Sequence, residues 1–306
     1  MPPLILRILS SSVVIARRAG EVIRDVLRGG DLGVVEKGVN DPQTEADRRA
    51  QRCIVSSLKY QYPQVTVVAE EELEPSPADD KDRVDGFEEE VLRAQCPETL
   101  TNVKETDITV WVDPLDGTAE FTAGGYLDHV TVLIGIAVGS QPIAGVVYQP
   151  FYKSESDLGR TLWGMVGLGV HGDFHPTTPT KRRTIASTRS HNTKIATAAV
   201  EAMQPDVVLA VGGSGYKCLL VLEGHASAYV FAHPGTKKWD TCAPNALLHA
   251  VGGHMCDVKG NLFEYHCGIA HINHLGVLAT MADVDWYVGK IPPEVSEILS
   301  KNMPNE

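Results

Sequence analysis

Apolar residues recur at helical spacing through the N-terminal segment of the chain. Leu4, Ile8 and Ile15 share one face, and arginines interrupt the run. This pattern predicts an amphipathic helix from about Leu4 to Arg28, which stops at Gly29 and docks on the core. The arginines argue against a signal peptide or a membrane span.

The patterns that follow predict a second helix and then a set of strands. A turn at Asn40–Pro42 precedes a helix that carries Thr44 and Asp47 near its start. Short apolar runs predict strands at Val65–Ala69, Val110–Val112, Val130–Val138 and Ile143–Tyr148. The last two are expected to form an antiparallel pair that turns at Gly139–Ser140.

The segment after about Asp157 has short strands, many glycines and two helical patterns, Asn192–Met203 and Cys242–Val251. Mixed helices and strands of this kind predict an α/β (α+β) fold. We expect two tightly packed halves, an α+β half at residues 1–156 and an α/β half at residues 157–306.

Composition and charge narrow the possible classes of protein. The chain has 306 residues, of which 43% are hydrophobic, so it can bury a large core. Its formal net charge of -12 repels nucleic acid and anionic membranes, and neither is expected as a partner. A small anionic ligand would need a local reversal of this field, for which a bound cation is the simplest source.

The cysteine pattern bears on the cellular location. The six cysteines form no C-x-x-C pair and lie in hydrophobic stretches, which is typical of reduced, mostly buried thiols. A disulfide framework is not expected. These features favour a cytoplasmic protein. The sequence leaves the oligomeric state open, and a monomer is compatible with it.

The strongest chemical signal is the stretch from Asp113 to Thr118, which reads Asp-Pro-Leu-Asp-Gly-Thr. A hydrophobic strand delivers Asp113 at its carboxyl end, and Gly117 allows a sharp turn that points Asp116 to the same place. The two carboxylates and the carbonyl oxygen of Leu115 would form an all-oxygen set that suits Mg²⁺. An Asp-rich turn without a ligand is the ordinary alternative, and acidic partners elsewhere favour the metal site.

Three further acidic stretches supply those partners. Asp240 is expected to cap a helix that starts at Thr241 and also to touch a metal. Asp47 lies at the start of the second helix, and Glu70 opens a run of three glutamates after a strand. Carboxylates gathered in a partly dry cleft repel each other, by about 4 kcal/mol for a pair roughly 4 Å apart at an effective dielectric near 20. Cations are therefore needed at this site.

These stretches, and above all the motif from Asp113 to Thr118 followed by Trp239–Asp240, resemble the motifs of the inositol monophosphatase and fructose bisphosphatase superfamily. Within it, the chain is similar to the 3′(2′),5′-bisphosphate nucleotidase family in the longer strings Val130–Ala137, Thr188–His191 and Gly235–Pro244. The resemblance extends from Asp31 to about Thr280. It implies a layered α-β-α-β-α sandwich.

The resemblance also implies roles for single residues. The groups that would bind two or three Mg²⁺ ions are Glu70, Asp113, Asp116, Asp240 and the carbonyl of Leu115. The pair that would activate the attacking water is Asp47 and Thr118. The residues that would contact the substrate are Thr118, His191, Gly213, Lys217 and Asp240. Most metal ligands would then lie in the first half, whereas Asp240 and the nucleotide contacts would lie in the second.

Two positions depart from the family pattern. Ala69 stands where a glycine usually precedes the metal-binding glutamate, so the choice of Glu70 over Glu71 and Glu72 follows the alignment alone. Ala119 stands where close relatives often have a basic residue, which removes an expected phosphate contact near the turn.

The activity that the resemblance implies is a magnesium-dependent, lithium-sensitive phosphomonoesterase. It would remove the 3′-phosphate of adenosine 3′,5′-bisphosphate, giving AMP, and that of 3′-phosphoadenosine 5′-phosphosulfate. The alternatives are an inositol polyphosphate 1-phosphatase or another inositol phosphate phosphatase and, in a different class, a non-catalytic nucleotide- and metal-binding protein. For the enzyme, replacing Asp116 with alanine is expected to abolish turnover and to relieve repulsion between carboxylates.

Overall fold

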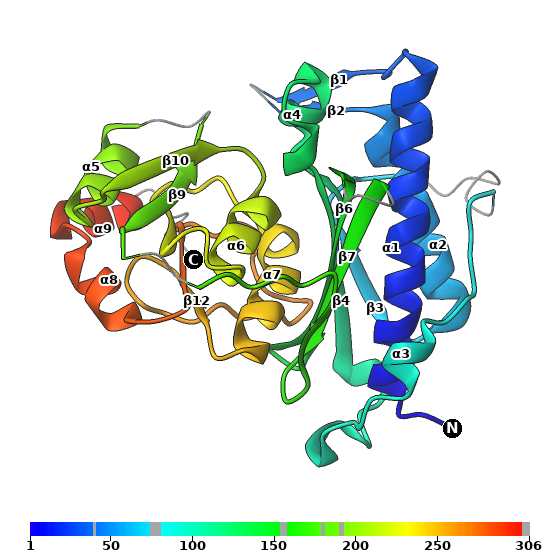
Figure 1. Cartoon of the computed structure of the whole chain (residues 1–306). Coiled ribbons are helices and arrows are strands. Elements are labelled where there is room, and N and C mark those ends of the chain that lie inside the picture. The colour runs from blue at the N-terminus through cyan, green and yellow to red at the C-terminus, as the bar shows by residue number, and fades with distance from the viewer. Residues whose placement is uncertain (39–40, 74–80, 154–157, 179–180, 190–192, 302–306) are drawn as a thin grey trace.

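Five layers of secondary structure make up the molecule, which the computed structural model describes for residues 1–38, 41–73, 81–153, 158–178, 181–189 and 193–301. Figure 1 shows these layers from right to left: two long helices, a twisted sheet, a central pair of helices, a second sheet and an outer group of helices. The α-β-α-β-α sandwich that the family resemblance implies is therefore confirmed.

The layer at one side consists of α1 (Leu4–Gly29) and α2 (Glu45–Gln61), which pack against each other and on the first sheet. α1 buries the predicted apolar face and ends where Gly30 adopts a left-handed conformation, with φ 79°. The first sheet has the order β3-β4-β5-β6-β7-β8. Its strands are β3 (Thr66–Ala69), β4 (Ile108–Asp116), β5 (Thr131–Val138), β6 (Gln141–Lys153), β7 (Leu158–Met165) and β8 (Gly169–Gly172).

The central strands of the first sheet include one hairpin that the sequence predicts and one strand that is longer than predicted. β5 and β6 form the expected antiparallel hairpin, which turns at Gly139. β4 is longer than expected, because it continues past Val112 to Asp116 and all of its residues are buried. Helices cover both faces of this strand, so even its polar end lies inside the molecule.

The central layer, α6 (Ser214–Leu222) and α7 (Lys238–Ala250), covers the other face of the first sheet. α7 approaches β5 and β6 closely at two glycines. A side-chain carbon at Gly135 would lie 2.6 Å from the backbone nitrogen of Ala243, and one at Gly145 would lie 2.6 Å from the carbonyl oxygen of the same residue. Both strand positions therefore require glycine.

The second sheet has the order β10-β9-β11-β13-β12. Its strands are β9 (Thr184–Thr188), β10 (Val207–Val211), β11 (Ala228–Phe231), β12 (His254–Cys256) and β13 (Val277–Thr280). An outer apolar cluster joins this sheet to α5 (Lys194–Ala202), α8 (Val284–Lys290) and α9 (Pro293–Lys301). The division into residues 1–156 and 157–306 stays a prediction; β7 and β8 pair within the first sheet, and the second sheet begins with β9.

A hairpin and two short helices complete the first half. β1 (Val35–Gly38) pairs with β2 (Asp41–Gln43), and β2 lies beside α4 (Thr118–Ala123) at the upper end of the first sheet (Figure 1). α3 (Glu89–Leu92) lies against α1. Among the helices of the described ranges, none has both the length and the apolar character needed to cross a membrane.

Candidate active site

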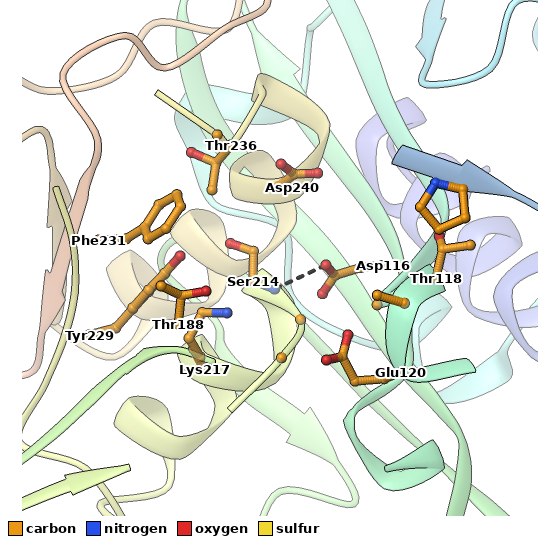
Figure 2. Close-up of a pocket in the computed structure, with 16 residues that line it drawn as sticks. Asp116, Thr118, Glu120, Thr188, Ser214, Lys217, Tyr229, Phe231, Thr236 and Asp240 are labelled. Atoms are coloured by element: carbon orange, nitrogen blue, oxygen red, sulfur yellow. Dashed lines mark hydrogen bonds between the residues drawn. The ribbon is translucent and has the colours of Figure 1, made fainter. Parts of the chain in front are cut away.

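A pocket of about 190 Å³ opens between the two sheets, where β4 ends. In Figure 2, Asp116 and Thr118 line one side of the pocket, whereas Ser214, Lys217 and Asp240 come from the elements opposite. The pocket thus collects side chains from α4, α6 and the first turn of α7. The fold brings these segments together although they are far apart in the sequence.

Asp113 and Asp116 lie at the carboxyl end of β4, as the sequence predicts. The pairing register with β5 slips between the two residues. The backbone N–H of Leu115 donates to Asp113 Oδ1 at 3.0 Å, and Gly117 adopts φ 92° before α4 begins at Thr118. An irregular strand end followed by a left-handed glycine therefore presents both aspartates at one place.

A hydrogen bond joins Thr118 to Asp47. Thr118 Oγ1 lies 3.0 Å from Asp47 Oδ1 and 3.1 Å from the carbonyl oxygen of Leu115, so its single proton serves one of these acceptors at a time. Asp47 is fixed from behind, because its Oδ2 accepts the backbone N–H of Thr44, the N-cap of α2, at 2.7 Å. Burial raises the pKa of Asp47 to about 6, which is a range in which a carboxyl exchanges protons near neutral pH.

Glu70 and Glu71 have different surroundings, which bears on the choice between neighbouring glutamates. Glu71 accepts a hydrogen bond from the amide of Gln43 and pairs with Lys37 Nζ at 2.8 Å. Glu70 also reaches Lys37, at 3.2 Å, but burial and then the charge of Asp240 raise its pKa to about 8. Glu70 therefore interacts with the cluster of aspartates, while Glu71 has protein partners of its own.

Asp240 lies in the first turn of α7 and is not its N-cap, which corrects the sequence-based expectation. The helix begins at Lys238, with Lys237 as N-cap, whereas the pattern predicts a start at Thr241. Asp240 Oδ2 accepts the backbone N–H of Lys237 at 2.7 Å and so caps the helix from its third position. Lysine is not a usual N-cap residue, and the pattern therefore places the start too late.

The carboxylates of the cluster repel one another. Burial, followed by the charges of Glu70, Asp116 and Asp240, raises the pKa of Asp113 well above its ordinary value. Burial and then the charge of Asp116 raise the pKa of Asp240 to about 6. The protein around the cluster therefore compensates only part of its negative charge.

Asp116 differs from its neighbours because protein donors hold both of its oxygens. The backbone N–H of Ser214 donates to Oδ1 at 2.9 Å, and that of Gly215 donates to Oδ2 at 2.7 Å. Thr131 Oγ1 donates to Oδ2 at 3.0 Å. Asp116 thus closes the N-terminus of α6, an arrangement that the helix dipole favours and that the sequence analysis missed.

Three residues of the second half, His191, Gly213 and Lys217, were expected to contact the nucleotide. Two of them lie on the other side of the pocket. Gly213 forms the turn before α6 with φ 70°, and Lys217 lies one helical turn further on, with a pKa that burial lowers. His191 lies outside the residues that the structure describes. Glu120 and Thr188 also line the pocket; Thr188 begins a string that resembles the family, whereas nothing in the sequence pattern singled out Glu120. Glu120 lies only two residues after Thr118 in the same helix, and this spacing could have identified it as a residue of the pocket.

The donor chemistry of the cluster fits a hard divalent cation. Glu70, Asp113 and Asp240 offer carboxylate oxygens, and Leu115 offers a carbonyl oxygen at the same strand end, which is the donor type that Mg²⁺ prefers. The raised pKa values indicate a deficit of positive charge that a cation would correct. Within the described part of the chain, no three acidic, histidine or cysteine side chains already stand in a metal-binding arrangement.

We expect the protein without divalent cations to lose stability as the pH rises. The pKa of Glu70 is raised to about 8 and that of Asp240 to about 6, so the folded state keeps protons that the unfolded chain releases near about pH 4. This stabilising contribution is complete below about pH 4 and disappears as the pH rises through 6 and then 8. Thermal unfolding in EDTA is expected to give a lower Tm at about pH 8.5 than at about pH 5.5, and Mg²⁺ is expected to reduce the difference. A Tm that rises with pH over this range in EDTA would contradict the prediction.

Comparison with protein-family models gives a match to the inositol monophosphatase family over residues 7–285, which is most of the chain. The chain belongs to the inositol monophosphatase family. Among curated proteins, 3′(2′),5′-bisphosphate nucleotidase 1 of Homo sapiens is 48% identical, and the match covers 96% of this chain and 97% of the relative. The nucleotidase of Dictyostelium discoideum is 36% identical, with 93% and 96% covered.

A more distant relative and two solved structures are also similar to the chain. The Golgi-resident adenosine 3′,5′-bisphosphate 3′-phosphatase of Bos taurus is 31% identical over 84% of this chain and 72% of the relative. The suppressor protein suhB of Bartonella henselae has a TM-score of 0.67 at 19% identity, covering 96% of this chain and 98% of that one. An IMPase of Thermotoga maritima has a TM-score of 0.64 at 18% identity, with 94% and 97% covered. These two structures confirm the fold.

Proposed function

We propose that this inositol monophosphatase family member is a magnesium-dependent, lithium-sensitive bisphosphate nucleotidase. It removes the 3′-phosphate of adenosine 3′,5′-bisphosphate, giving AMP, and that of 3′-phosphoadenosine 5′-phosphosulfate. The observation that carries the proposal is the 48% identity to a 3′(2′),5′-bisphosphate nucleotidase over 96% of the chain. The carboxylate cluster beside a pocket that also contains a buried lysine supports the same reaction.

The groups proposed to hold two or three Mg²⁺ ions are Glu70, Asp113, Asp116, Asp240 and the carbonyl of Leu115. Bound magnesium would increase the nucleophilicity of a water molecule and neutralise the charge that develops on the phosphoryl oxygens. Asp116 can contribute while it holds α6, because its Oδ1 accepts one hydrogen bond from Ser214 and a carboxylate oxygen has two lone pairs.

Asp47 and Thr118 are proposed to orient the attacking water and to take its proton. The Thr118 hydroxyl lies between Asp47 and the end of β4, so it can fix the direction of a water that approaches the cluster. Asp47 has a pKa of about 6 and is held by the cap of α2, so it can accept a proton without moving. A fixed acceptor costs no reorganisation when the phosphate ester is cleaved.

Lys217 and Gly213 are proposed to bind the part of the nucleotide that does not react, and Thr118 and Asp240 to contact the substrate beside the reacting phosphate. Lys217 supplies a positive charge within the pocket lining. Because Lys217 is buried, water screens its interaction with an anion weakly. His191, outside the described residues, stays a predicted contact. A cytoplasmic location and a monomeric state stay predictions as well.

A phosphate-release assay with a panel of substrates tests the proposal. The protein with Mg²⁺ is expected to release phosphate from adenosine 3′,5′-bisphosphate faster than from inositol 1,4-bisphosphate, to lose this activity in EDTA and to be inhibited by millimolar Li⁺. Faster turnover of the inositol substrate would favour an inositol phosphate phosphatase, in keeping with the 30% identity to inositol monophosphatase 3 of Xenopus laevis. Tight nucleotide binding without phosphate release would indicate a non-catalytic binding protein.

A further inference from the structure

An ion pair at the edge of the pocket joins two residues that the proposed reaction does not yet use. Glu120 lies on α4, which follows β4 of the first sheet, and Arg189 directly follows β9 of the second sheet. Arg189 Nη2 lies 3.0 Å from Glu120 Oε1. Glu120 is 4% exposed and lines the pocket, so the pair connects the two sheets at the wall of the site.

The surroundings are shaped to hold this pair in one position. The guanidinium of Arg189 lies 4.2 Å from the centre of the Tyr126 ring, which limits its orientation. A side-chain carbon at Gly212 would lie 2.0 Å from Glu120 Oε1, so glycine at this position leaves the space that the carboxylate fills. The pair thus combines a buried carboxylate in the wall with an arginine whose side chain is 36% exposed and rests on an aromatic ring.

The pair also controls what lies next to the substrate. Thr188, the last residue of β9, lines the pocket and precedes Arg189 directly, so an anchored Arg189 fixes Thr188 as well. The charge of Glu120 is also felt at Lys217, on the opposite side of the pocket. Lys217, the proposed contact of the non-reacting part of the nucleotide, lines the same pocket, as do Asp116 and Asp240 of the proposed metal site. The pair therefore acts where the non-reacting part of a substrate would lie.

We propose that Glu120 is a positioning residue that determines specificity: through Arg189 it holds the end of β9 against α4 and so forms the wall that binds the non-reacting part of a nucleotide. The inference rests on the proposed function for the identity of that ligand. It assigns no contact with the reacting phosphate to Glu120.

Inhibition by the two reaction products, AMP and inorganic phosphate, distinguishes this positioning role from a general effect on the site. AMP keeps the base, the ribose and the second phosphate, whereas inorganic phosphate represents only the group that is removed. For Glu120→Gln and for Arg189→Met, we expect the inhibition constant of AMP and the KM of adenosine 3′,5′-bisphosphate to rise about tenfold. The inhibition constant of phosphate and kcat are expected to stay within about twofold of wild type.

The double variant tests whether the two residues act as a unit. Because each single change breaks the same pair, Glu120→Gln with Arg189→Met is expected to bind AMP no more weakly than Arg189→Met alone. An electrostatic role alone would give the opposite result for Glu120→Gln, since loss of a negative charge beside Lys217 would tighten AMP binding. Tighter binding, or equal losses for AMP and phosphate, would overturn the proposal.

A matched control distinguishes positioning from stability. Glu223→Gln breaks a buried arginine–carboxylate pair, in which Arg160 Nη1 lies 2.6 Å from Glu223 Oε1, and neither residue lines the active-site pocket. Glu223→Gln is expected to lower the Tm and to leave the ratio of the inhibition constants of AMP and phosphate unchanged. A shifted ratio would show that any loosened buried pair has this effect, and would overturn the proposal.

Calorimetric titration with AMP and with phosphate gives the same comparison without turnover. Failure of the proposed enzymatic function would appear as missing phosphate release by the wild-type protein. Failure of the positioning role would appear as unchanged AMP binding in Glu120→Gln.

Discussion

Replacing Asp113 with asparagine is expected to abolish turnover and, at the same time, to stabilise the protein in EDTA. Asp113 is fully buried among carboxylates that raise its pKa, and asparagine keeps the oxygen that accepts the N–H of Leu115. The change removes a proposed metal ligand, so kcat is expected to fall by at least about 10³-fold, equivalent to about 4 kcal/mol. Removal of a buried, uncompensated charge is expected to raise the free energy of unfolding without metal by about 1–3 kcal/mol.

Phosphate release with Mg²⁺ and denaturant unfolding in EDTA measure the two effects. Asp82→Asn is the control, because burial would raise the pKa of Asp82 but Arg49 and Arg18 bring it below its ordinary value. This variant is expected to lose stability and to keep its activity. If Asp113→Asn is less stable than wild type in EDTA, the inference that the carboxylates of the cluster repel one another is wrong.

Replacing Asp116 with asparagine is expected to abolish turnover and to destabilise the protein, in contrast to Asp113. The carboxylate of Asp116 accepts three hydrogen bonds, from Ser214, Gly215 and Thr131, and asparagine offers a single acceptor oxygen. Its amide group would face donors at the N-terminus of α6. Leaving buried donors without acceptors is expected to cost about 2–4 kcal/mol of unfolding free energy.

This prediction revises what the sequence indicated for Asp116. Like-charge repulsion alone predicts that removing the carboxylate of Asp116 stabilises the metal-free protein. The hydrogen bonds from α6 predict that the same change destabilises it. Thr131→Val is the matched control, since it removes one of the three donors, and a loss of about 1 kcal/mol with most activity retained is expected. Equal or higher stability of Asp116→Asn in EDTA would show that repulsion outweighs the hydrogen bonds.

The sequence predicted the site best where the chemistry is local. The motif from Asp113 to Thr118 encodes its own turn, because glycine permits the left-handed conformation that ends β4. The apolar period of α1 and the β5–β6 hairpin are equally local, and both were predicted. The fold class followed from these elements together with the family resemblance.

The sequence could not predict contacts that depend on backbone groups brought from a distance. The N–H groups of Ser214 and Gly215 hold Asp116 across about a hundred residues, and backbone donors carry no residue-type signature. The start of α7 was missed because Lys237 is an atypical N-cap and Asp240 caps from the third position. The different partners of Glu70 and Glu71 likewise depend on Lys37, from a hairpin that is remote in sequence.

The two glycines beneath α7 limit how this protein can be recombined with its relatives. Gly135 and Gly145 belong to the first sheet, yet the space above them is filled by Ala243 of a helix that also carries Asp240. A chimera that takes α7 from one parent and β5 and β6 from another must inherit glycine at both strand positions. An alanine at position 135 would lift α7 from the sheet and move Asp240 away from Asp113. The boundary at which such proteins can exchange segments therefore lies outside the unit formed by β4, β5, β6 and α7, and not between the two sheets.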